Sequence, residues 1–216
     1  MSDHQEPSSI QGLYAITDPE LITAENLISA VEEVIHGGAK VIQYRNKSAS
    51  YTLQHQQASQ LSRLCKQHRV SFIINDDPQL AKAVAADGVH VGKDDGKIAA
   101  ARQLLGPKAI IGVSCYKYLE NAHKAIAQGA DYVAFGRFFP SRTKPEAVQA
   151  DLQLLEQASR QLAVPIVAIG GVTRDNARQL IQRGADALAV INDLFHDNHD
   201  IYNTAKTYQA LFNLKS

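Results

Sequence analysis

Gly129-Ala130-Asp131-Tyr132-Val133 and Gly184-Ala185-Asp186-Ala187-Leu188 share the pattern that decides the fold of this chain. Gly38-Ala39-Lys40-Val41-Ile42 and Asp87-Gly88-Val89-His90-Val91 follow the same logic. In each stretch a helical segment ends, and glycine suits the left-handed position that closes a helix. The run that follows is apolar on both faces, as a buried parallel strand requires. Each stretch therefore predicts a helix that leads directly into a buried strand.

Reading outward from these stretches gives eight strands separated by segments of helical periodicity. The predicted strands are Leu13–Ile16, Val41–Gln43, Phe72–Ile74, Gly88–Val91, Ile110–Val113, Tyr132–Phe135, Ile166–Ile169 and Ala187–Val190. Strict alternation predicts a parallel sheet with helical crossovers. The first turn, Thr17-Asp18-Pro19, lacks the glycines of an open dinucleotide-binding sheet. We therefore predict an α/β fold, a single (β/α)₈ TIM barrel over residues 1–216, closed by a loop and an amphipathic helix after Asp193.

Composition excludes several classes of protein. The chain has 22 basic and 22 acidic residues, so no charge excess points to nucleic acid or to an anionic membrane. Residues 1–11 form a polar extension unlike a signal peptide, and no apolar run is long enough to span a bilayer. Cys65 and Cys115 are isolated, which predicts buried, reduced thiols. We expect a cytoplasmic protein with small-molecule partners, and leave open whether it forms a homo-oligomer.

Polar residues follow almost every predicted strand, where such barrels place their active sites. Gln43, Arg45 and Lys47 alternate after the second strand, so in an extended segment they project to one side. Two cations and an amide on one side predict a diphosphate clamp. A solvated loop with ordinary surface charges is the alternative, and the acidic residues of the neighbouring loops favour the clamp.

Asp76 and Asp95 follow the third and fourth strands, which are neighbours in a barrel. Two converging carboxylates repel one another unless a cation or a proton lies between them. Oxygen ligands without histidine or cysteine favour Mg²⁺. The alternative is that they cap helices or pair with Lys47 or Lys93, although Asp77 and Asp94 suit helix capping better.

A second anion site is predicted at the exits of the seventh and eighth strands. Gly170-Gly171 and Ile191-Asn192 occupy the place where barrels often hold a phosphate with backbone N–H groups. After the sixth strand, Lys144 lies in a long loop as a cation that could reach over the site. Ser114 follows the fifth strand, whereas His90, inside the fourth, is interpreted as a core or supporting residue.

Taken together, these motifs resemble the thiamine phosphate synthase family in order and at similar intervals, from Leu13 to about Leu194. The motifs are Gln43-Tyr44-Arg45-Asn46-Lys47, Ile74-Asn75-Asp76, His90-Val91-Gly92-Lys93-Asp94-Asp95, Gly112-Val113-Ser114, Phe139-Pro140-Ser141-Arg142-Thr143-Lys144 and Ala168-Ile169-Gly170-Gly171-Val172.

The resemblance implies that hydroxymethylpyrimidine diphosphate joins the ring nitrogen of a thiazole phosphate, giving thiamine phosphate and pyrophosphate. In that family the diphosphate departs to leave a pyrimidine-stabilised cation, which the thiazole nitrogen then captures. The resemblance further implies Mg²⁺ as cofactor, with Asp76 and Asp95 as its ligands. It implies that the catalytic residues are Arg45, Lys47, Ser114 and Lys144. It implies that these four catalytic residues also bind substrate, together with Gln43, Asn75, Ser141, Thr143, Gly171, Ile191 and Asn192.

Two departures and two rival functions accompany the resemblance. Ile191-Asn192 stands where the family often has Val-Ser, and Ser141 stands where Thr is usual. The first departure weakens thiazole phosphate binding only if the missing hydroxyl takes part in it. One rival is the related thiazole tautomerase, which lacks the Asn-Asp pair and the second carboxylate. The other is a non-catalytic barrel that carries or senses thiazole phosphate, which needs neither the clamp nor the metal pair.

Overall fold

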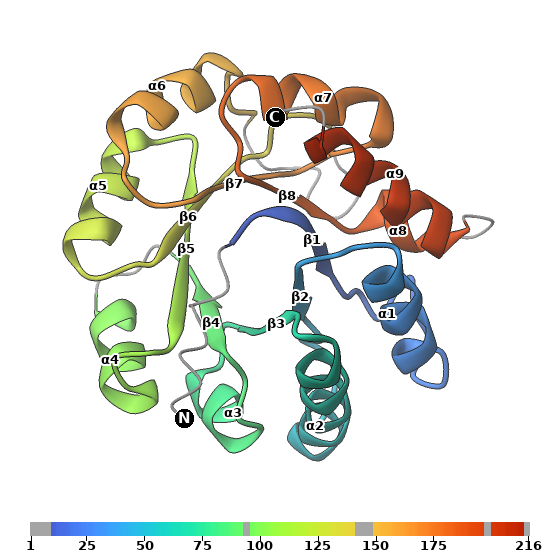
Figure 1. Cartoon of the computed structure of the whole chain (residues 1–216). Coiled ribbons are helices and arrows are strands. Elements are labelled where there is room, and N and C mark those ends of the chain that lie inside the picture. The colour runs from blue at the N-terminus through green and yellow to red at the C-terminus, as the bar shows by residue number, and fades with distance from the viewer. Residues whose placement is uncertain (1–9, 93–95, 141–148, 197–199, 214–216) are drawn as a thin grey trace, which may run out of the picture.

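The computed structural model describes residues 10–92, 96–140, 149–196 and 200–213, which form a closed barrel of eight parallel strands ringed by helices (Figure 1). The strands pair in chain order, and β8 closes the ring against β1. Their bounds are β1 Gly12–Ile16, β2 Val41–Tyr44, β3 Ser71–Asn75, β4 Gly88–Val91, β5 Ile110–Tyr116, β6 Tyr132–Phe135, β7 Ile166–Ile169 and β8 Ala187–Val190. The predicted (β/α)₈ fold is confirmed, and β4, β6, β7 and β8 have the predicted bounds.

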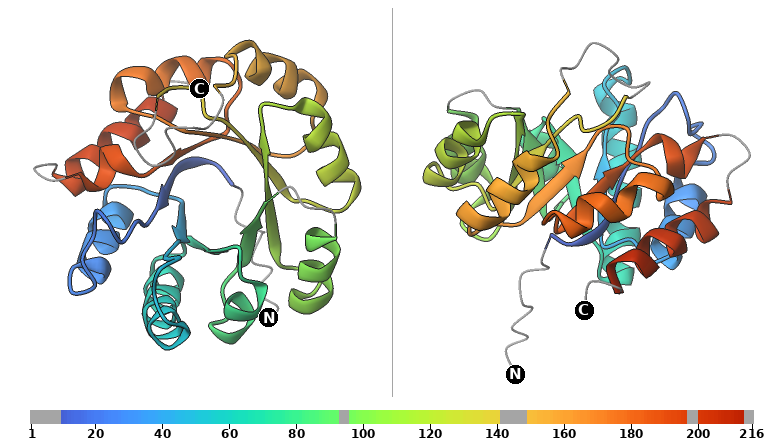
Figure 2. Two further views of the ribbon diagram at one scale, coloured as in Figure 1. Left: turned by 180° about the vertical axis from the view of Figure 1, so that it is seen from behind. Right: turned by 90° about the horizontal axis from the view of Figure 1, so that it is seen from above.

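The helices form the outer layer, as the views in Figure 2 also show. Their bounds are α1 Leu27–His36, α2 Tyr51–His68, α3 Pro78–Ala83, α4 Lys97–Leu105, α5 Leu119–Ala127, α6 Gln153–Gln161, α7 Arg174–Gln182, α8 Asn192–Phe195 and α9 Ile201–Asn213. The final helix is confirmed as α9, but a short helix, α8, begins where a loop was expected. None of the helices in the described part of the chain is long and apolar enough to cross a membrane.

The recurring sequence before several strands closes the preceding helix and also fixes the register of neighbouring strands. Gly129 and Gly184 have positive φ angles of 93° and 106°, as the predicted left-handed closures require. The aspartate of this sequence then accepts a backbone N–H near the start of the preceding strand, which fixes the two strands in register. These bonds are Asp87 to Phe72 at 2.8 Å, Asp131 to Ile111 at 2.7 Å and Asp186 to Ile166 at 2.9 Å.

Both faces of the sheet are buried, which explains the continuous apolar runs. Leu13 and Ala15 of β1 pack outward in the layer beneath the helices, whereas Tyr14 and Ile16 point into the barrel interior. Ile10, at the end of the polar extension, is 4% exposed and belongs to the interior cluster. A packed interior of this kind leaves free space only at the ends of the barrel, where the strands stop.

Candidate active site

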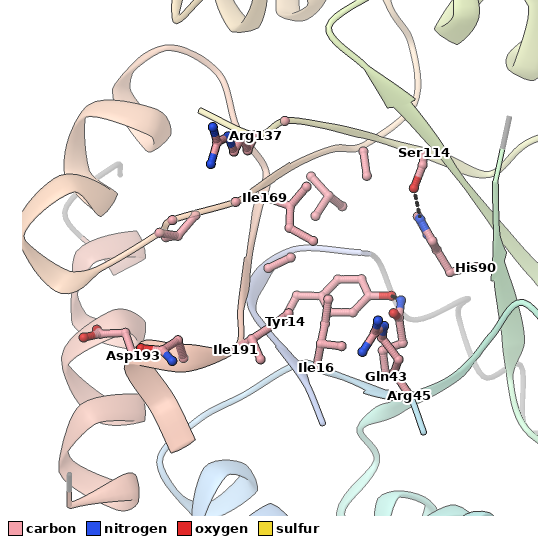
Figure 3. A pocket seen from close by; sticks show the side chains of 18 of the residues that line it. Tyr14, Ile16, Gln43, Arg45, His90, Ser114, Arg137, Ile169, Ile191 and Asp193 are labelled. Atoms are coloured by element: carbon pink, nitrogen blue, oxygen red, sulfur yellow. Dashed lines mark hydrogen bonds between the residues drawn. The ribbon is translucent and has the colours of Figure 1, made fainter. Parts of the chain in front are cut away.

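A cavity of about 340 Å³ opens at the carboxyl ends of the strands. Every one of the eight strands or its following segment contributes to its wall. The lining residues that carry the later argument are Tyr14, Gln43, Arg45, Asn75, His90, Ser114, Tyr132, Arg137, Gly170, Gly171, Ile191 and Asn192. Figure 3 shows Arg45 and Arg137 on opposite sides of this cavity, with Ser114 and His90 on a third side.

A chain of hydrogen bonds crosses the base of the cavity. Ser114 Oγ lies 2.8 Å from His90 Nε2, and His90 Nδ1 lies 2.9 Å from the hydroxyl of Tyr132. The two phenol oxygens of Tyr132 and Tyr14 are 2.8 Å apart. Gln43 Nε2 donates to the Tyr14 hydroxyl at 2.7 Å. Five side chains from five strands are therefore held as one unit.

We infer the direction of this chain from its donor end, with each phenol hydroxyl accepting one bond and donating one. The Nε2 of Gln43 can only donate, so the Tyr14 oxygen accepts there and the Tyr14 hydroxyl donates to the oxygen of Tyr132. Tyr132 then donates to His90 Nδ1, and the Nε2–H of His90 donates to Ser114. Burial raises the pKa of both phenols well above the ordinary value, so they remain protonated donors. In this arrangement the hydroxyl proton of Ser114 is directed to whatever occupies the cavity.

Arg45 enters the cavity from the end of β2. Its backbone N–H donates to Thr17 Oγ1 at 3.0 Å, and its Nη1 lies 3.8 Å from a carboxylate oxygen of Asp18. Asp18 is 6% exposed and follows the neighbouring strand β1. The guanidinium is thereby oriented from one side, and its remaining donors are available to an anion.

A second hollow adjoins the cavity, with Asn75 on the wall of both. Here Lys47 Nζ lies 2.8 Å from Asp76 Oδ2, which also accepts from the Asn75 amide at 2.9 Å. Burial opposes ionisation of Asp76, but Lys47 and Asn75 together lower the pKa of this carboxyl below its ordinary value. Asp76 is therefore a carboxylate at neutral pH, held in a left-handed backbone conformation with φ of 62°.

The opposite wall is made by the glycine pair after β7. Gly170 and Gly171 have φ angles of 94° and 66°. A Cβ on Gly171 would lie 2.3 Å from the carbonyl oxygen of Pro140, so only glycine fits this turn. Asn176 in α7 donates to the Gly171 carbonyl at 2.9 Å and fixes the turn against the helix. The turn at Gly170 and Gly171 is therefore held in one conformation on the cavity wall.

The exit of β8 is fixed by side chains as well. Ile191 immediately precedes α8 and Asn192 begins it. The next residue, Asp193, pairs with Arg174 of α7 at 3.2 Å and accepts from the Tyr208 hydroxyl of α9 at 2.7 Å. These bonds hold the second predicted phosphate segment between two outer helices.

Arg137 follows Gly136 at the exit of β6 and lines the same wall as the glycine pair. A Cβ on Gly170 would meet the Cβ of Arg137 at 2.2 Å, so the two residues are in close contact. The Nε atom of Arg137 is buried and has no hydrogen-bond partner among the described residues. Buried donors are nearly always paired, so an anion bound at this wall would complete the arrangement.

Comparison with known proteins shows the family to which this barrel belongs. The family model described as thiamine monophosphate synthase matches residues 13–194. The chain belongs to the thiamine monophosphate synthase family. It is 53% identical over 213 residues to the thiamine-phosphate synthase of Methylobacillus flagellatus, covering 99% of this chain and 100% of that relative. It is 51% identical over 205 residues to the enzyme of the same name from Nitrosococcus oceani, covering 95% and 94%.

A solved structure of the same family agrees with the fold. The thiamine phosphate pyrophosphorylase of Pyrococcus furiosus superposes with a TM-score of 0.85 at 32% sequence identity, covering 95% of this chain and 96% of that one. Membership of the thiamine monophosphate synthase family makes this protein an enzyme of the transferase class.

Most of the site residues that the sequence predicts for a thiamine monophosphate synthase lie together. Seven line the cavity at the strand ends: Gln43, Arg45, Asn75, Ser114, Gly171, Ile191 and Asn192. Lys47 and Asp76 instead face the adjoining hollow, because β2 ends at Tyr44 and strict alternation stops there. Asp77 caps α3 through a bond from Leu80 N at 2.9 Å, as the sequence suggests. Asp95, Ser141, Thr143 and Lys144 lie outside the described residues.

The sequence did not predict three residues that line the cavity, and it assigned a fourth only a supporting role. Tyr14, Tyr132 and Arg137 were not singled out, and His90 was interpreted only as a core or supporting residue. The sequence held a signal for His90. It lies beside Asn75 in the register of β3 and β4, and Asn75 was already predicted as a site residue. Arg137 directly follows the strand exit at Gly136, where polar residues are informative in this fold.

Proposed function

We propose that this protein is a thiamine phosphate synthase, which joins the hydroxymethylpyrimidine group of its diphosphate to the ring nitrogen of thiazole phosphate. One observation carries the proposal: a single cavity has anion-binding groups on two opposite walls (Figure 3). Arg45 and Asn75 form one wall, and Arg137 with Gly171 forms the other. Two phosphorylated substrates need two such ends, with their reacting atoms between them.

The diphosphate binds at the wall of Arg45. When the bond from the pyrimidine methylene carbon to the diphosphate oxygen breaks, its electron pair stays on the departing diphosphate. The fixed guanidinium of Arg45 and the ammonium of Lys47 stabilise this growing negative charge, because they need no reorganisation as it develops. Thiazole phosphate is held by Gly171, Ile191 and Asn192, and its nitrogen lone pair forms the new bond to the methylene carbon.

Ser114 orients the pyrimidine between these two ends. Its hydroxyl oxygen accepts from His90, so the proton is available to an acceptor atom of the ring. A hydrogen bond fixed in this way holds the methylene carbon in line between the leaving oxygen and the attacking nitrogen.

The adjoining hollow suits Mg²⁺. Asp76 is ionised, and carboxylate oxygens are ligands that Mg²⁺ prefers. We propose that Asp76 holds the ion together with Asp95. The ion supplies additional neutralisation of the diphosphate when it is bound. Lys144 is proposed as a further cation for the same anion.

The location of the protein is proposed from its thiols. Cys65 and Cys115 are free and buried, and burial raises the pKa of each to about 12. Such thiols are neither nucleophiles nor disulfide partners, which suits the reducing cytoplasm.

The test is product formation by the purified protein with both substrates and Mg²⁺, followed by mass spectrometry. We expect thiamine phosphate, and expect EDTA to abolish its formation. Arg45→Ala should reduce the rate about a hundredfold, since it removes a charge that acts on the leaving group. Arg160→Ala, at an exposed position on α6, serves as the matched control. Tight binding of thiazole phosphate without any product would instead identify a carrier or sensor.

A further inference from the structure

A cluster of metal-ligating side chains lies on the outside of the barrel, away from the cavity. Glu32 and His36 are four residues apart on α1 and therefore share one face of that helix. His68 is the last residue of α2, which packs beside α1 (Figure 1). The two imidazole rings meet edge to face with centroids 5.1 Å apart. A ligand atom of each of the three residues lies within 4.8 Å of the other two.

The position of the cluster is separate from the reaction. His36 and His68 end their helices, and the chain leads from there into the starts of β2 and β3. The cavity lies at the other ends of these strands. The cluster is thus on the opposite end of the barrel, and nothing in the proposed reaction uses it.

The ligand chemistry selects one class of ion. Two imidazole nitrogens and one carboxylate oxygen form a set that suits Zn²⁺ and similar transition ions, whereas Mg²⁺ prefers oxygen ligands alone. In a tetrahedral zinc site with bonds of about 2.1 Å the ligand atoms lie roughly 3.4 Å apart. All three side chains are exposed, so small rotations are enough to bring them to that spacing.

The two helices favour the cation further. Because His36 and His68 are C-terminal residues of α1 and α2, the cluster lies where both helix dipoles present their negative ends. We propose that Glu32, His36 and His68 form a surface site for Zn²⁺ or a similar divalent transition ion, which links α1 to α2. The proposal does not depend on the proposed reaction.

The first test is calorimetric titration of the protein, without an affinity tag, with ZnCl₂ in saturating Mg²⁺. Magnesium is expected to fill the proposed site at Asp76, so zinc binding that persists and is lost in the histidine variants reports on the outer cluster. We expect one zinc ion per chain with a micromolar dissociation constant. His36→Gln and His68→Gln should each weaken binding at least about tenfold, since each removes one of three protein ligands. His123→Gln, at an exposed position on α5, should leave the affinity unchanged.

Thermal unfolding and cobalt spectra give independent measurements. Zinc at about a hundredfold above its dissociation constant should raise the Tm of the wild-type protein by about 5 °C or more, and should not do so in His68→Gln. Co²⁺ should give the visible absorption bands of a tetrahedral site, absent in the same variant. The metal-free variants should unfold at the wild-type Tm because the positions are exposed. Unchanged zinc affinity in both histidine variants would overturn the site, as would zinc binding weaker than millimolar.

Discussion

Ser114 is the last residue of the hydrogen-bond chain that crosses the base of the cavity. Its oxygen accepts from His90, which is fixed in turn by the Tyr132 hydroxyl. The tautomer of His90 therefore depends on a phenol that contacts no substrate in the proposed arrangement. A side chain of this kind acts on the reaction by positioning another.

Tyr132→Phe tests this positioning role. The change keeps the buried ring but leaves His90 Nδ1 without its donor, so both tautomers become available. We expect kcat to fall about tenfold with little change in KM for thiazole phosphate, and the free energy of unfolding to fall by about 1–3 kcal/mol. Tyr202→Phe, which alters a partly exposed phenol on α9, is the control. Loss of stability with full kcat would show that Tyr132 only supports the fold.

Arg45 and Arg137 face the cavity from opposite walls, and each is expected to serve a different substrate (Figure 3). Arg137→Ala should raise KM for thiazole phosphate about 10–100-fold, because a charge-assisted hydrogen bond contributes about 1.5–3 kcal/mol. Arg45→Ala should act chiefly on the pyrimidine diphosphate. Steady-state kinetics with each substrate varied in turn measure both effects. Equal effects of Arg137→Ala on both substrates would contradict the assignment of walls.

At the scale of single elements, the strands were the most predictable part of the chain. Their apolar runs follow from burial on both faces, and the glycine before many of them follows from helix closure. β5 runs to Tyr116 instead of Val113, because polar Ser114 ends an apolar run but still belongs to the sheet. The short helix α8 was missed, since Asp193 is held by partners on α7 and α9 that no local pattern reveals.

Candidate site residues also divide into those that local sequence predicts and those that depend on contacts distant in the chain. Gln43, Arg45 and Asn75 could be predicted because strand exits converge on one rim in this fold. Lys47 was harder, because its direction depends on where β2 ends and on its pairing with Asp76. The chain from Gln43 to Ser114 was not predicted at all, since its bonds join residues far apart in sequence.

The aspartates that immediately precede β4, β6 and β8 are predicted to hold neighbouring strands in register. Asp186→Ala removes the acceptor for Ile166 N and leaves that backbone N–H unpaired at the edge of the core. We expect the free energy of unfolding to fall by about 1.5–3 kcal/mol, the range for a hydrogen bond to a charged group. Urea unfolding measures it, with exposed Glu33→Ala as the control. Equal stabilities of the two variants would remove this role for the aspartate.

At the scale of the whole molecule, the last helix is joined to the active site. α9 packs between α1 and α7, and so covers the place where β8 meets β1. Its Tyr208 is fully buried and donates to Asp193 in α8, the helix that begins with a proposed phosphate-binding residue. The bond from Tyr208 to Asp193 therefore joins the helix that covers the β8–β1 seam to the segment proposed to bind phosphate.

Tyr208→Phe distinguishes the part of α9 in barrel closure from its part in positioning the phosphate segment. The change keeps the buried ring and removes only the hydrogen bond to Asp193. Asp193 retains Arg174 as a partner, so we expect a modest loss of about 1 kcal/mol in the free energy of unfolding. Looser placement of Ile191 and Asn192 should raise KM for thiazole phosphate about fivefold and leave KM for the pyrimidine diphosphate unchanged. Urea unfolding and kinetics on the same preparation measure both, with Tyr202→Phe on the same helix as the control. A loss of stability with unchanged KM for thiazole phosphate would show that α9 closes the barrel without positioning the phosphate segment.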